Sequence, residues 1–189
     1  MIKFRKILIV IILLSSAVST AGFASEGLKN MISVEAGYGF IITDTELLPA
    51  SPHGLLTTAY YGYVIHDKPK SMSVLSLVLG YTMFPDAVES DGLHNMVYGL
   101  EYSHYFFTHK TISLLVDYGL QFNLILQSGR EGYSFGHHTK LGVGGVWNAS
   151  ERHKLSLNGA YNFVTSPYFE LSSRKFTFPS VTLRYHFLY

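Results

Sequence analysis

The chain has 189 residues, which suits one domain, and it contains no cysteine. The lack of cysteine excludes a disulfide framework, thiolate chemistry and a lipid-attachment cysteine. Hydrophobic residues make up 48% of the chain and charged residues only 14%, with a formal net charge of +1. We therefore expect a protein that is in contact with membrane lipid.

The first 24 residues have the pattern of a secretory signal peptide. A basic start, MIKFRK, precedes the apolar run Ile7–Leu14, and Gly22 and Ala24 stand at the −3 and −1 positions of a cut after Ala24. The run is too short to be read first as a spanning helix, although an uncleaved anchor and a cut after Ala21 are alternatives. Three of the 14 basic residues would be removed, leaving 11 against 13 acids from Ser25 onward. This balance excludes a polycationic nucleic-acid binder.

The next 165 positions, residues 25–189, form the expected mature domain, and eight segments in it alternate between apolar and polar or glycine residues. Successive strand residues point to opposite faces, so each segment predicts a strand with one apolar face. The longest uninterrupted example, ISLLVDYGLQFNLILQ, exceeds the usual 5–6 residues of a soluble strand and suits a tilted bilayer crossing. The predicted strands are Met31–Ile42, Leu55–Ile65, Met72–Phe84, Asn95–Phe107, Ile112–Gln127, Phe135–Trp147, Leu155–Val164 and Phe176–Tyr189.

The segments between these strands alternate in predicted length. Short turns are expected at His66–Ser71, Thr108–Thr111 and Asn148–Lys154, and longer loops at Thr43–Gly54, Pro85–His94, Gln127–Ser134 and Thr165–Lys175. Short periplasmic turns and longer extracellular loops are typical of outer-membrane barrels. Five prolines fall in the connections, at Pro49, Pro52, Pro69, Pro85 and Pro167, and Pro179 predicts a bulge or a late strand start.

The predicted outward faces carry no Asp, Glu, Lys or Arg. The inward faces collect an interior polar cluster of Glu35, Glu101, Asp117, Lys140 and Arg184. Glu35 and Arg184 are expected at similar depth on neighbouring strands, and the other three on the opposite wall, within reach of Arg184. The fold class predicted is all-β, an eight-stranded antiparallel up-and-down transmembrane β-barrel with a filled interior.

The mature chain resembles the small bacterial outer-membrane barrels of the OmpX and OmpA-transmembrane type. Its carboxy end adds to the likeness, because it alternates to a terminal aromatic residue through Val181, Leu183, Tyr185, Phe187 and Tyr189. The resemblance implies a multi-pass protein of the outer membrane, surrounded by its lipids and lipopolysaccharide. It also implies that Tyr185, Phe187 and Tyr189 act as a signal for the outer-membrane assembly machinery.

Nine histidines invite a search for catalytic and metal sites. No group of them has ligand spacing, so we expect neither a metal nor a cofactor. A lipid A deacylase of the PagL type would need a His-x-Ser pair and an acid. His137 and Thr139 are the nearest match, but the closest downstream acid, Glu151, falls at the other end of the strand. We therefore expect His137 to be an interfacial residue and identify no catalytic residue.

The expected function is a structural or surface-interaction role through the extracellular loops, chiefly Thr43–Gly54 and Thr165–Lys175. The partner would be an extracellular protein or glycan and not a nucleic acid. Two alternatives come from other classes: a lipid A-modifying enzyme and a narrow conduit for small hydrophobic molecules.

Overall fold

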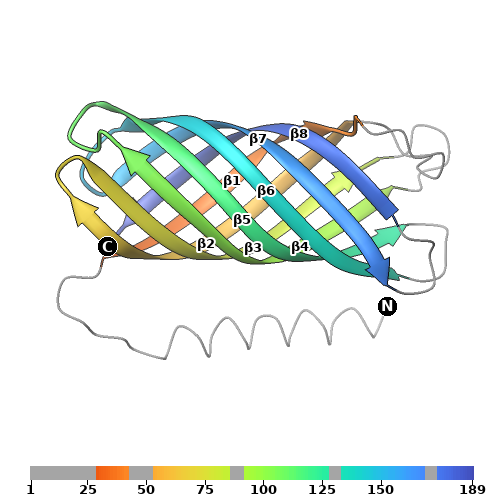
Figure 1. The fold of residues 1–189 in the computed structure, drawn as a ribbon. Helices are drawn as coiled ribbons and strands as arrows, with labels where there is room; N and C mark the ends of the chain where they lie inside the picture. The colour runs from red at the N-terminus through yellow and green to blue at the C-terminus, as the bar shows by residue number, and fades with distance from the viewer. Residues whose placement is uncertain (1–28, 43–52, 86–91, 128–132, 169–173) are drawn as a thin grey trace.

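The computed structural model describes residues 29–42, 53–85, 92–127, 133–168 and 174–189. The predicted signal peptide and Ser25 lie outside these residues. The described residues form eight strands that wrap into one barrel (Figure 1). They are β1 (Asn30–Phe40), β2 (His53–Lys68), β3 (Ser71–Phe84), β4 (Leu93–Phe106), β5 (Ile112–Gln127), β6 (Tyr133–Asn148), β7 (His153–Tyr168) and β8 (Arg174–Leu188).

Every strand pairs antiparallel with its sequence neighbour, and β1 pairs with β8 to close the barrel. The closing register sets Glu35 opposite Arg184, and Asn30 and Tyr189 exchange backbone hydrogen bonds of 2.9 and 3.0 Å at the end of the seam. No helix in the described part of the chain is long and apolar enough to cross a membrane. The predicted fold class is confirmed.

Two ends of the barrel can be distinguished by their connections (Figure 1). The end that we call the turn end holds the carboxy terminus and the β2–β3, β4–β5 and β6–β7 connections, residues 69–70, 107–111 and 149–152. The opposite end, the loop end, holds the connections 41–52, 85–92, 128–132 and 169–173. Three of the predicted long loops are shorter than predicted, because strands extend into them, and the connections are 85–92, 128–132 and 169–173. The predicted turn His66–Ser71 is also shorter, because β2 continues to Lys68. β7 continues to Tyr168 and β8 begins at Arg174, so Thr165–Lys175 is not one long loop.

Both proline predictions at this end need correction. Pro167 lies within β7 instead of in a loop. Pro179 marks neither a bulge nor a late start of β8, because it lies within that strand and stays in register with Tyr161 of β7. On its other side the ladder between β1 and β8 ends at Gly39 and Ser180, so Pro179 stands where that ladder has already finished.

The barrel has its apolar residues outside. Outward side chains such as Ile112 (68% exposed) and Leu120 (56% exposed) face the surroundings, whereas their neighbours Ser113 and Gln121 are buried. Exposed charged residues in the described strands, such as Lys68 and Lys175, lie within two residues of a strand end. The middle of the exterior is thus free of charge, as the alternating pattern predicted.

Glycine permits the close approach of strands inside. A Cβ atom on Gly99 would stand 2.6 Å from both the Cα of Gln121 and the carbonyl oxygen of Leu120 on β5. These are backbone atoms that cannot turn aside, so a larger residue here would push β4 and β5 apart.

Candidate functional site

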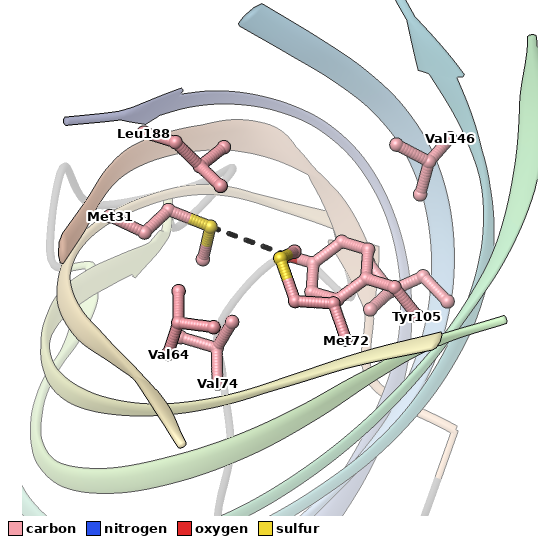
Figure 2. Close-up of a cluster of buried hydrophobic side chains, with 8 residues drawn as sticks. Met31, Val64, Met72, Val74, Tyr105, Val146 and Leu188 are labelled. Atoms are coloured by element: carbon pink, nitrogen blue, oxygen red, sulfur yellow. Dashed lines mark hydrogen bonds between the residues drawn. The ribbon is translucent and has the colours of Figure 1, made fainter. Parts of the chain in front are cut away.

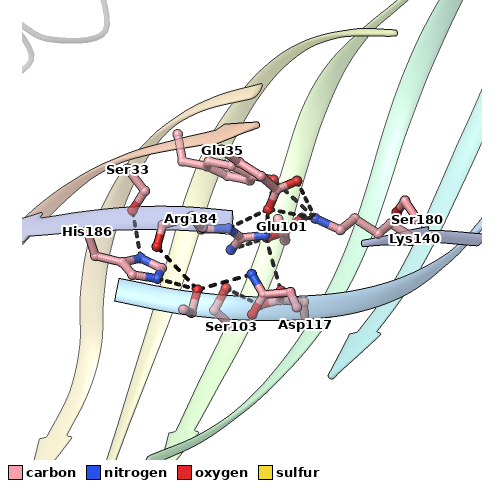
Figure 3. Close-up of polar contacts among 12 residues, drawn as sticks. Ser33, Glu35, Glu101, Ser103, Asp117, Lys140, Ser180, Arg184 and His186 are labelled. Carbon is pink, nitrogen blue, oxygen red and sulfur yellow. Dashed lines mark hydrogen bonds and ion pairs between the residues drawn. The ribbon is translucent and has the colours of Figure 1, made fainter. Parts of the chain in front are cut away.

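Five charged side chains from five strands meet in the middle of the lumen (Figure 3). Arg184 lies at their centre, with guanidinium nitrogens 2.6 Å from Glu35, 2.9 Å from Glu101 and 3.2 Å from Asp117. Lys140 joins the same acids, at 3.3 Å from Glu35 and 3.2 Å from Glu101. We call these five residues the charged network.

The network includes all five residues of the predicted interior cluster, and it differs from the prediction in one respect. The sequence favoured one pair on the β1–β8 seam and a second group on the opposite wall. In the structure Lys140 contacts both Glu35 and Glu101, so the two groups are one. Tyr60 also joins them, since its hydroxyl accepts hydrogen bonds of 3.1 Å from both Lys140 and Arg184, and its ring lies 4.2 Å from the guanidinium carbon.

Each charge in the network is almost fully withdrawn from solvent, from Glu101 at 0% to Lys140 at 5% exposure. Removing charges from water costs several kcal/mol per ion, and only close partners offset that cost. The network is therefore a cross-brace between strands on opposite sides of the barrel. It also fills the centre of the lumen.

Apolar side chains close the lumen on both sides of the network, which the sequence analysis did not predict. The turn-end cluster is drawn in Figure 2 and contains Met31, Val64, Met72, Val74, Tyr105, Leu115, Val146 and Leu188. The loop-end cluster contains Leu56, Phe84, Leu93, Ile125, Val164, Phe176 and Phe178. The signal was present in β5, whose inward face carries Leu115 and Ile125 on either side of its polar residues.

A small polar cavity of about 20 Å³ remains between the charged network and the loop-end cluster. Its wall includes Gln121, His138, Asn162 and Ser180 as well as the charged Lys140. A space of this size holds about one water molecule, so it is no passage for solutes.

The predicted assembly-signal residues lie on β8 and at the carboxy terminus. Tyr185 and Tyr189 are exposed on the outer face, at 41% and 49%. The Tyr185 hydroxyl lies 2.6 Å from His153 Nδ1, and the Phe187 ring stacks on that of Tyr189 at 6.0 Å. The three residues thus form part of an aromatic strip at the turn end. Their role as a signal stays a prediction.

The candidate enzyme residues are not brought together. His137 is exposed on β6, where its ring packs at 5.5 Å from that of Phe122, and Thr139 is two residues further on. Glu151 lies in the turn after β6, twelve residues beyond Thr139, and the nine residues from Thr139 to the end of β6 at Asn148 alone span roughly 30 Å. No group of three or more His, Cys, Asp or Glu side chains in the described residues is arranged to hold a metal ion.

A different serine–histidine pair appears on the outer face near the turn end. The hydroxyl of Ser73 lies 2.8 Å from His104 Nδ1 and 3.0 Å from the Tyr102 hydroxyl. Sequence reasoning missed it because Ser73 and His104 are joined only by the β3–β4 register. In the described part of the chain the side-chain partners of His104 are hydroxyl groups and aromatic rings. The pair therefore lacks the carboxylate that orients the histidine base of a catalytic triad.

Neither protein-family models nor curated proteins match this sequence. Solved structures do match its fold. Neisserial surface protein A has a TM-score of 0.65 at 14% identity, over 86% of this chain and 99% of that one. The chain has the fold of the small outer-membrane β-barrels. Two more such barrels are similar: Ail, the attachment invasion locus protein of Yersinia pestis, solved with the heparin analogue sucrose octasulfate, and the outer-membrane enzyme PagL.

The likeness extends over whole chains. Ail aligns with a TM-score of 0.55 at 13% identity, over 86% of this chain and 99% of its own. PagL aligns with a TM-score of 0.52 at 12% identity, over 83% and 98%. A barrel with an apolar exterior and buried charges inside is stable only with lipid around it. The chain is therefore a barrel that spans the outer membrane, and short turns at the periplasm with longer loops outside are the usual arrangement of such barrels.

Proposed function

We propose that this small outer-membrane barrel acts at the cell surface, as a structural or interaction protein that presents its loop-end segments. The observation that carries the proposal is the closed lumen. Among the described residues, a charged network between two apolar clusters fills the lumen, and this filling favours a surface role over transport of solutes through the interior. Contact with a partner then falls to the segments that join the strands outside the membrane.

The sequence of those segments narrows the class of partner. Residues 41–52, 85–92, 128–132 and 169–173 contain seven acids and one base, and Lys175 and Arg174 follow the last of them. The name of Ail refers to attachment, and its structure contains a sulfated heparin analogue, which is a polyanion. An acidic surface repels polyanions. We therefore expect this chain to favour a cationic or neutral protein surface over a sulfated glycan.

Bead binding tests the proposal. Cells that display the protein are mixed with polylysine-coated and heparin-coated beads at low and at physiological salt. We expect capture by polylysine above the level of cells without the protein, and none by heparin. The variant Asp86→Asn/Glu89→Gln/Asp91→Asn should lose about half of the gain, because it removes three of seven acids. Glu151→Gln, in a turn at the opposite end, is the control. Capture by heparin beads would contradict the proposal.

The two alternatives predict other results. A conduit would give steady channels in a planar bilayer, whereas the closed lumen predicts none. A lipid A-modifying enzyme of the PagL type would change the mass of lipid A on incubation with the purified protein. We expect the mass to stay unchanged, because His137 has no acid within reach in the described structure. Stable channels or a deacylated product would each replace the proposal.

A further inference from the structure

Two of the short turns at the turn end are tied into one rigid surface. The backbone amide of Phe107 donates a 2.7 Å hydrogen bond to the carbonyl of Lys70, across from the β4–β5 turn to the β2–β3 turn. The Thr108 hydroxyl donates to the carbonyls of Pro69 and Lys68, at 3.3 and 3.5 Å. Phe107 has a φ of 61°, a left-handed conformation that is costly for a bulky residue, and its ring is 50% exposed.

Three lysines stand on this surface. Lys68, Lys70 and Lys110 are exposed, and the Nζ atom of Lys110 lies 5.5 Å from the centre of the Phe107 ring. The acid next to Lys68 is Asp67, and its carboxylate is already 3.0 Å from the ammonium group of Lys29. The three charges are therefore left without a matching acid on these two turns.

Polar side chains also lie directly beside these turns on the lipid-facing side of the barrel. Ser73, Tyr102 and His104 form the hydroxyl–imidazole group described above, in which Tyr102 is 39% exposed and Ser73 only 4%. His104 stands two residues, or about 7 Å, before the end of β4, and its ring packs 4.3 Å from that of Phe106. Aromatic side chains near the strand ends of a barrel are typical of the membrane–water interface, so we place this group at the level of the lipid phosphate and ester groups.

We propose that this surface binds an anionic glycerophospholipid of the periplasmic leaflet. Lys68, Lys70 and Lys110 hold the phosphate and its excess negative charge. The exposed Tyr102 hydroxyl and the His104 ring hydrogen-bond the phosphate or glycerol ester oxygens, Ser73 holds both of them from below at 3.0 and 2.8 Å, and the Phe107 ring lies at the lipid interface. The hydrogen bonds between the two turns hold the backbone of Lys68 and Lys70 in place before the lipid arrives, which reduces the entropy lost on binding.

Charge distribution selects this partner over others at the same membrane. At the turn end the described residues include six Lys or Arg (Lys29, Lys68, Lys70, Lys110, Arg152 and Lys154) and two acids, Asp67 and Glu151, whereas the loop-end segments are acidic. A zwitterionic lipid gains little from three unpaired lysines, but an anionic one gains from each of them. The inference is independent of the proposed surface function, because it concerns the other end of the barrel.

Native mass spectrometry of the folded protein in a neutral detergent tests the proposal. The protein is titrated with dioleoylphosphatidylglycerol and, separately, with dioleoylphosphatidylcholine. We expect tighter binding of phosphatidylglycerol, and about a hundredfold loss of that affinity in Lys68→Gln/Lys70→Gln/Lys110→Gln, at roughly fivefold per lysine. Binding of phosphatidylcholine should not change. A gel that separates folded from heat-denatured barrel verifies that the variant is folded.

Matched variants keep the test decisive. Lys175→Gln removes an exposed lysine near the loop end and should leave phosphatidylglycerol binding unchanged. His104→Phe should weaken it severalfold without changing the charge of the turns. Equal binding of the two lipids, or an equal loss in Lys175→Gln, would overturn the proposal. So would displacement of the lipid by equimolar glycerol 1-phosphate, which would indicate a free-phosphate site, or release of fatty acid, which would indicate an enzyme.

Discussion

The lumen has two halves on either side of the charged network, and they differ in how their buried polar groups are satisfied. In the turn-end half both ring nitrogens of His186 have partners. Nδ1 lies 2.9 Å from the Ser33 hydroxyl and 3.3 Å from that of Tyr105, and Nε2 lies 3.0 Å from the Ser156 hydroxyl. This half is a bonded hub capped by the apolar turn-end cluster (Figures 2 and 3).

The loop-end half leaves several polar atoms without a protein partner. The side-chain amides of Asn95 and Asn123 are fully buried, and no described residue hydrogen-bonds to them. His138 bonds to Asn162 through Nε2 at 3.0 Å, but its Nδ1 is likewise without a partner. Each such group costs about 1–3 kcal/mol unless water reaches it. The polar cavity lies in the same half.

The contrast indicates which half of the barrel can open locally. Local opening of a half whose buried polar groups are hydrogen-bonded breaks those bonds and therefore costs more free energy. Local opening of a half with unpaired polar groups costs less, because water can then satisfy them. The yielding half is the one that carries the loop-end segments, where we place the surface function. The rigid half carries the closing seam and the turns that we assign to lipid binding.

The largest expected effect comes from removing the end of the rigid half. Deleting Phe187–Tyr189 removes Leu188 from the turn-end cluster and the two backbone bonds between Tyr189 and Asn30. The turn-end part of the seam, at Asn30–Ile32 of β1, would lose its β8 partners and face lipid unpaired, which is costly. We expect export to continue but no folded barrel to accumulate in the outer membrane. Membrane fractionation with a heat-modifiability gel measures this, and normal levels of folded barrel would refute it.

Arg184 stands on the border of the two halves, and its loss should be the most damaging single substitution. Arg184→Ala leaves three carboxylates buried with only Lys140 to face them. Breaking a buried ionic set in this way costs about 3–5 kcal/mol. We expect a lower urea midpoint for unfolding in lipid vesicles, and a smaller decrease for Lys140→Ala, which leaves Arg184 in contact with all three acids.

Lys175→Ala is the matched control for both substitutions. Its side chain is exposed, and exposed pairs contribute about 0–1 kcal/mol. If Arg184→Ala were as harmless as Lys175→Ala, the charged network would not hold the two halves together.

Much of this architecture follows from the sequence, and the reason is visible in β5. Its alternation is uninterrupted, so the prediction Ile112–Gln127 agrees with the structure at both ends. The depth match of Glu35 and Arg184 was likewise predictable, because both lie a few residues from the two strand ends that close the seam. Counting residues along strands is enough for such neighbours.

The rest required the closed fold. That Lys140 on β6 meets Glu35 on β1 depends on the shear of the barrel, which decides which strands face each other across the lumen. The ends of β7 and β8 were missed because Ser166 and Pro167 are read as loop residues, although barrel strands tolerate them near an end. The Ser73–His104 pair depends on register in the same way.

The bonded hub should lose stability when His186 is replaced by an apolar residue. His186→Leu removes the common partner of Ser33, Ser156 and Tyr105 and leaves their hydroxyls without it. Stranding buried groups costs about 1–3 kcal/mol, so we expect the urea midpoint to decrease by a corresponding amount. Hydrogen exchange should show weaker protection in β1 and β8 before β4 and β5. An unchanged midpoint would mean that the hub contributes no net stability.

The smallest effect, and the sharpest test of the contrast, is expected at Asn123. It is buried on β5 in the loop-end half, where its amide has no described partner, and Leu is close to it in size. Replacing an unsatisfied buried amide with an apolar group removes a desolvation cost without breaking a bond. Asn123→Leu should therefore leave the urea midpoint unchanged or raise it, in the opposite direction to His186→Leu. The two variants are measured in the same vesicles, so that differences in lipid cancel. A loss of stability as large as that of His186→Leu would show that Asn123 is bonded through ordered water and that the two halves are equally well satisfied.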